Sequence, residues 1–112
     1  MFGIFKKRVN DEDVIKASFI SACELYKVQQ KSGGMLSDPK NIEAMYVTIS
    51  QKDFQIEPTP YLVNYGKTIA MTFLMEEKFI ADIVKRDRSG TFEGLTDSDL
   101  MRMREILKDL IK

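Results

Sequence analysis

Ile69-Ala-Met-Thr-Phe-Leu-Met75 is the stretch that decides the fold of this 112-residue chain. It lies inside the longer segment 61–88, which carries strong helix signals at both ends, yet it has almost no polar face. A helix that is apolar on all sides has to be covered on all sides, by the rest of its domain, by a second copy or by a partner. The sequence therefore predicts a compact, mostly helical domain built around this central helix.

Proline and glycine residues set the limits of the central helix. Thr59 can cap its start, and Pro60 suits the first helical position, because an N–H at that position would have no partner within the helix. Gly90 can end it just beyond a basic last turn. The sequence thus predicts one continuous helix from Pro60 to about Arg88, on the order of 40 Å long.

Amphipathic helices are predicted on both sides of the central helix. The first should run from near Asn10 to near Lys31, where Gly33-Gly34 can end it. The last should begin at Thr96, with Asp99 completing a capping-box-like start. Both have an apolar stripe at helical spacing, formed by Ile15, Ser18, Phe19, Ala22, Leu25, Tyr26 and Gln29 in the first and by Leu100, Met103, Leu107, Leu110 and Ile111 in the last.

The segment that follows Asp38 has two interpretations. Asp38 and Pro39 make a clean helix start, and helix propensity favours a helix to about Ser50 followed by a loop. The same residues also fit a short hairpin near 45–57. The predicted fold class is all-α, a small bundle of three to four helices around a long central helix, with an α+β fold as the alternative. We expect residues 1–9 to form a flexible or docked arm and residues 10–112 to form a single helical domain.

Composition and charge narrow the classes of function. Lys plus Arg and Asp plus Glu number 17 each, so the formal net charge is zero, and the balance also holds along the chain. Proteins that bind nucleic acid usually concentrate positive charge on one face or tail, which disfavours that class here. The longest apolar run is about seven residues even if Thr72 is counted, against roughly 20 for a membrane span. With one cysteine and no signal-peptide pattern, the expected location is the cytoplasm.

The sequence offers little to support catalysis. It has no histidine, the commonest general base and metal ligand. Cys23 is interpreted as a small buried hydrophobe, and Glu76 and Glu77 diverge by roughly 100° on a helix, so they form no tight pair. The segment 87–99 fails the calcium-loop pattern at its third, fifth, sixth and twelfth positions. We therefore expect a protein that is not an enzyme and has no catalytic residues, no cofactor and no metal.

The remaining hypothesis is a non-enzymatic protein-binding or regulatory module that acts through a helical surface, with another protein or a second copy as its partner. The candidate contact residues are Tyr61, Tyr65, Gly66 and Met101. Gly66 and Ala70 make a small-residue surface that another backbone can approach closely. That surface is interpreted either as a partner groove or, preferentially, as close packing against the first helix.

Two alternatives use positive charge. The N-terminal segment combines aromatic and basic residues that can rest on an anionic membrane, namely Phe2, Phe5, Lys6, Lys7 and Arg8. Each cation near such a surface contributes about 1 kcal/mol, so a single short segment gives weak binding. A nucleic-acid-associated regulator is the second alternative, and the balanced charge disfavours it.

Overall fold

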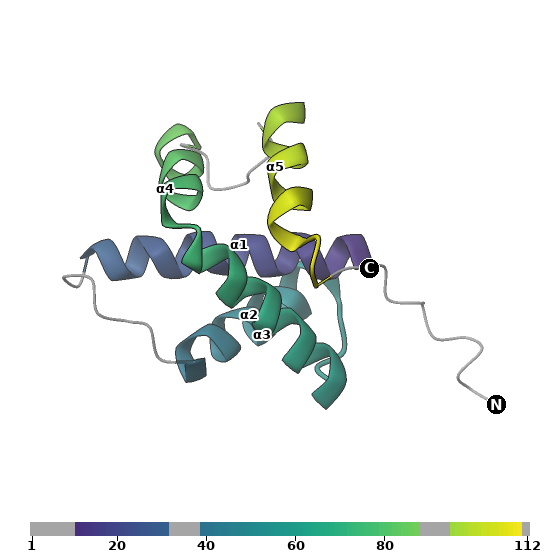
Figure 1. Ribbon diagram of the computed structural model, residues 1–112. Coiled ribbons are helices and arrows are strands. Elements are labelled where there is room, and N and C mark those ends of the chain that lie inside the picture. Colours follow the sequence, from purple (N-terminus) through teal and green to yellow (C-terminus); the bar gives the residue numbers. More distant parts are fainter. Residues whose placement is uncertain (1–10, 32–38, 88–94, 111–112) are drawn as a thin grey trace.

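The computed structural model describes residues 11–31, 39–87 and 95–110, which contain five helices and no strand. The helices are α1 (Asp11–Lys31), α2 (Pro39–Phe54), α3 (Pro60–Met75), α4 (Glu77–Arg86) and α5 (Asp97–Leu107) (Figure 1). The all-α prediction is therefore confirmed. The prediction of three to four helices is close, but the count over these ranges is five.

The hairpin alternative near 45–57 is wrong. Helix α2 continues to Phe54, four residues beyond the predicted end at Ser50. It ends where Gln55 takes a positive φ of 53°, and the N–H of Ile56 then donates to the carbonyl of Ser50 at 3.0 Å. Burial of Ile42, Tyr46 and Ile49 along one side of this helix outweighs the local strand propensity of Val47-Thr-Ile49.

Helix α1 occupies the position that the sequence seemed to give to the segment 61–88. It packs against α2, α3 and α4, and in Figure 1 it runs across the middle of the molecule. Two serines lie on its buried side, and each donates its hydroxyl to the carbonyl four residues earlier: Ser18 to Val14 at 2.7 Å and Ser21 to Ala17 at 2.6 Å. These bonds satisfy both hydroxyls, so α1 can be buried over most of its length without an unpaired serine.

The continuous central helix is the main correction to the sequence analysis. The chain leaves helical geometry at Glu76, with φ −92° and ψ 63°, so that α3 and α4 are separate helices that point in different directions (Figure 1). Phe79, Ile80 and Ile83 explain the turn. Ile80 and Ile83 are buried in the same core as α1, and the ring of Phe79 lies 6.1 Å from that of Phe19. Tertiary burial therefore interrupts a segment whose local sequence favours helix.

The predicted starts of α3 and α5 are confirmed. The hydroxyl oxygen of Thr59 accepts from the N–H of Leu62 at 3.2 Å, with Pro60 in the first helical position. Thr96 and Asp99 form a reciprocal capping box, in which each side chain accepts from the other residue's backbone N–H. The features predicted at residues 1–10, 32–38, 88–94 and 111–112, including Gly33-Gly34 and Gly90, lie outside the described residues.

Asp99 also fixes α5 to α4. The Arg86 guanidinium on α4 donates to the Asp99 carboxylate on α5 at 2.8 Å. Burial opposes ionisation of Asp99, but hydrogen bonds from Arg86 and Thr96 outweigh it, and the pKa of Asp99 lies below its ordinary value. A second ion pair, Arg102 to Glu76 at 2.9 Å, joins α5 to the turn between α3 and α4.

The lowered pKa of Asp99 predicts a loss of stability in acid. A carboxylate whose pKa is lower in the folded state contributes stability above the unfolded pKa, about 3.9, and loses it as pH falls through the folded value. We expect Asp99→Asn to lower the free energy of unfolding by about 1 kcal/mol at pH 7 and by progressively less below about pH 4. Urea unfolding across this range measures the difference. The exposed Asp97→Asn is the control, and an equal effect of both variants at every pH would contradict the prediction.

Candidate partner-binding face

The outer side of α3 carries a stripe of five residues, here called the α3 face. Its members recur every three or four positions, so they lie within about a quarter-turn of one another. The two residues at its ends are exposed, whereas the three between them are half-buried, and the buried residues of the same helix are Gly66, Ile69, Ala70 and Phe73. The α3 face consists of Tyr61, Tyr65, Thr68, Thr72 and Met75.

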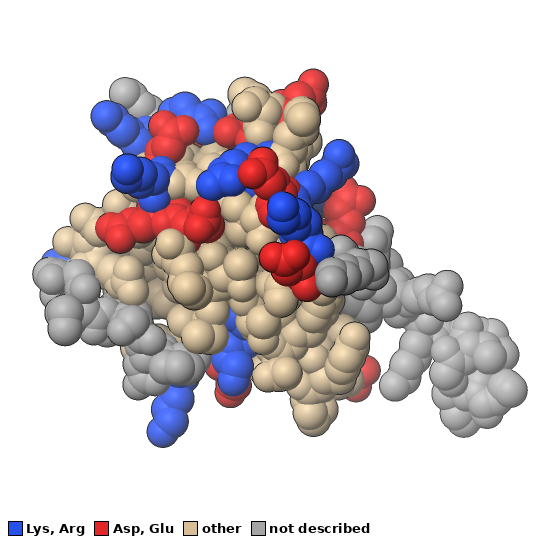
Figure 2. Space-filling model, viewed as in Figure 1, with Lys and Arg blue, Asp and Glu red and all other residues tan. Residues whose placement is uncertain are grey.

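The α3 face is uncharged. Lys67 is the only charged residue in α3, and its ammonium group lies 3.4 Å from the carboxylate of Glu43 on α2. Figure 2 shows a broad area without charged side chains over the middle of the molecule, where α3 lies in Figure 1, with acidic and basic side chains above it and at its edges. A partner can therefore approach this face without removing water from an isolated charge.

The two threonines make the face less polar than its composition suggests. The hydroxyl of Thr68 donates to the carbonyl of Asn64, and that of Thr72 donates to the carbonyl of Thr68, each at 2.8 Å. A threonine bonded back to its own helix has used its one donor. These two threonines therefore have no free hydroxyl proton to donate to a partner. Burying them under a partner leaves neither proton unpaired.

Large side chains occupy the two ends of the face. Tyr61 is 73% exposed and stacks on Tyr65, with ring centroids 6.1 Å apart and ring planes at 12°. Met75 at the other end is 81% exposed. It borders an open hollow of about 530 Å³ at the turn into α4, lined also by Glu76, Glu77, Lys78, Phe79 and Ala81. Aromatic side chains provide a large contact area and methionine adapts its shape to a partner, and both are enriched at partner-binding surfaces.

The sequence predicts contact residues at one end of this face, Tyr61 and Tyr65, but not at the other. Met75 belongs to the all-apolar run 69–75, in which hydrophobicity alone does not distinguish it. Counting from Tyr61 in steps of three and four residues would have found it. The run 69–75 is apolar on all sides, yet α3 presents Met75 to solvent while Ile69, Ala70 and Phe73 face the core.

Gly66 is buried, and the close approach it permits is intramolecular. A Cβ built on Gly66 would lie 2.1–2.4 Å from ring atoms of Tyr46, so the α3 backbone rests directly on that ring. The neighbour is α2, so the predicted packing of Gly66 against the first helix is wrong. Met101 is 67% exposed but belongs to α5, so it is not part of the α3 face. The membrane candidates Phe2, Phe5, Lys6, Lys7 and Arg8 lie outside the described residues.

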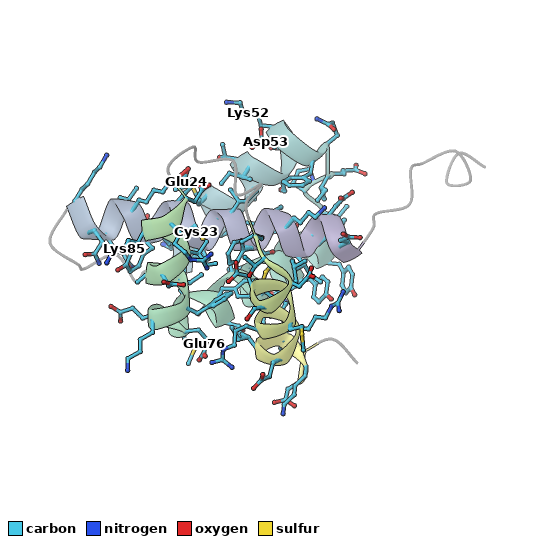
Figure 3. The ribbon with its side chains drawn as sticks, turned by 90° about the horizontal axis from the view of Figure 1, so that it is seen from above. Cys23, Glu24, Lys52, Asp53, Glu76 and Lys85 are labelled. Carbon is cyan, nitrogen blue, oxygen red and sulfur yellow. The ribbon has the colours of Figure 1, made fainter. Side chains whose placement is uncertain are left out.

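Groups with reactive chemistry do not converge in the described ranges. Burial raises the pKa of the Cys23 thiol to about 12, so it stays protonated near neutral pH and is a poor nucleophile. Figure 3 shows Glu76 well apart from Cys23, and its carboxylate is paired with Arg102. Across residues 11–31, 39–87 and 95–110, no three potential metal ligands of the Cys, Asp or Glu type come together.

Comparison of the chain with protein-family models, curated proteins and solved structures found no match. Among the helices described, none has both the length and the apolar character that crossing a bilayer requires. The properties of the α3 face are therefore the basis for the functional hypothesis.

Proposed function

We propose that this protein is a non-enzymatic protein-binding or regulatory module, and that a partner protein with an uncharged, apolar contact surface docks on the α3 face. The observation that carries the proposal is the pairing of a wholly uncharged stripe with two highly exposed large side chains, Tyr61 and Met75. Exposed apolar surface bordered by charged groups is typical of protein interaction sites. A charged ligand such as nucleic acid would find no complementary group on this face.

A second copy of the chain also meets these requirements. In a two-fold symmetric dimer the same patch lies on both subunits, so any charge near the axis would face its own kind. The α3 face has no charge to oppose such pairing, and the zero net charge of the chain adds little long-range repulsion. Light scattering over a range of concentrations separates this form from binding to a different protein.

The variant Met75→Glu tests the proposal by placing a charge at the most exposed residue of the expected contact. Once a partner has been isolated by affinity capture, titration calorimetry should give a dissociation constant at least tenfold weaker for Met75→Glu than for the unmodified protein, because binding an apolar surface would strip water from the new carboxylate. If the partner is a second copy, the dimer constant from light scattering should weaken by at least as much.

Lys52→Gln is the matched control. It changes the net charge by the same single unit, and Lys52 lies on the opposite side of the molecule from Glu76, the neighbour of Met75 (Figure 3). We expect it to bind as the unmodified protein does. Equal binding by Met75→Glu and the unmodified protein would show that the partner docks elsewhere, and the proposal would then be wrong.

A further inference from the structure

The turn at Glu76 is made by a residue that does not favour a turn. Glu76 is the one residue between Pro60 and Arg86 that lies outside a helix. Glutamate is among the better helix formers, and neither glycine nor proline is present near this position. Phe79, Ile80 and Ile83 hold the bend, because they place α4 against the core.

Breaking the helix at this point leaves backbone groups without helical partners. The N–H of Glu76 donates to the carbonyl of Phe73 at 2.9 Å, which closes a four-residue turn, and the Glu76 side chain makes no capping hydrogen bond to α4. The first N–H groups of any helix lack acceptors within it. If the chain were straight at Glu76, the first N–H groups of α4 would have carbonyl acceptors in the last turn of α3. The two helices would then form one helix of about 40 Å.

Helices α4 and α5 both follow the turn in the chain. An ion pair between Arg86 on α4 and Asp99 on α5, at 2.8 Å, links them, and α5 packs against α3. Figure 1 shows them standing on the same side of α1, away from α2. The surfaces that they bury include Ile80 and Ile83 on α4 and Met103 and Leu107 on α5. An identical site exists on any second copy of the chain.

We infer that two copies of this protein form a dimer by exchanging α4 and α5, with α3 and α4 of each chain joined into one continuous helix through Glu76. The exchanged helices make the same core contacts on the partner that they make in the monomer, so that burial is conserved. The helical hydrogen bonds regained at the former turn favour the dimer. Exchange of identical elements through a short connection is a recognised route to dimers.

Refolding from denaturant at high protein concentration tests the inference, because exchange requires α4 and α5 to leave the core first. Light scattering should then detect a dimer. Spin labels on cysteines introduced at Asn64 and Lys85, in labelled chains diluted with unlabelled ones, should lie roughly 32 Å apart along a continuous helix and clearly closer in the monomer. Cys23 is buried and does not compete for the label.

Glu76→Gly and Lys85→Gly form the matched pair of variants. Glycine inside a helix lowers the equilibrium constant for helix formation about fivefold relative to a good helix former. Each exchanged dimer contains two copies of residue 76, one in each chain. Glu76→Gly should weaken the dimer about 25-fold, since only the dimer needs helix at this position. Lys85→Gly should leave the dimer constant unchanged, because residue 85 is helical in both forms.

Three results would each overturn the inference: no dimer after refolding, a dimer with the monomer label distance, or equal dimer constants for Glu76→Gly and the unmodified protein. Exchange is separable from docking on the α3 face. Methionine and glutamate have similar helix propensity, so Met75→Glu should leave exchange intact while weakening partner binding. Glu76→Gly should weaken exchange and leave partner binding on the α3 face intact.

Discussion

Replacing Phe73 by alanine is expected to lower the free energy of unfolding by about 3–5 kcal/mol, the largest effect of any single truncation considered. Phe73 is fully buried in α3, and its ring meets that of Phe19 on α1 edge to face, with centroids 5.2 Å apart and planes at 81°. Truncation leaves a cavity and removes the contact between the largest fully buried side chains of α1 and α3.

Chemical denaturation followed by circular dichroism measures this loss. Phe73→Leu is the control, because it keeps most of the apolar volume and should lose about half as much or less. Met75→Ala, two residues away on the exposed side of the same helix, should change the stability by no more than about 0.5 kcal/mol. A loss below about 1 kcal/mol for Phe73→Ala would mean that the contact between α1 and α3 is not the centre of the core.

The contrast between Phe73 and Met75 illustrates what periodicity alone can and cannot predict. Both belong to an apolar run, so hydrophobicity gives no preference for burying one of them. In the structure the side of α3 that carries Gly66 is buried, because only on that side can the backbone lie against the Tyr46 ring. The orientation of α3, and with it the α3 face, therefore depends on a contact between two helices that the sequence does not pair.

The starts of α3 and α5 could be predicted from the sequence, because they depend on local contacts. The caps at Thr59 and Thr96 use side chains within three residues of the amides they satisfy, so they depend little on the rest of the fold. The turn at Glu76 was not predictable in this way. It arises from burial of Ile80 and Ile83 against α1, at the other end of the chain, and no local residue encodes it.

Gly66→Ala is expected to be the second most damaging change, despite the higher helix propensity of alanine. The added methyl would lie 2.1–2.4 Å from the Tyr46 ring, which is itself buried and cannot move aside freely. Overpacking of this kind costs up to about 3 kcal/mol, and the gain in helix propensity is about 1 kcal/mol, which leaves a net loss of about 2 kcal/mol.

A double-mutant cycle identifies the cause of that loss. Tyr46→Leu removes the aromatic ring that lies over Gly66. In this background Gly66→Ala should cost far less than it does alone, with a coupling of at least 1 kcal/mol. Simple additivity of the two changes would contradict a direct contact between the α2 ring and the α3 backbone. It would also mean that this contact does not set which residues of α3 face the solvent.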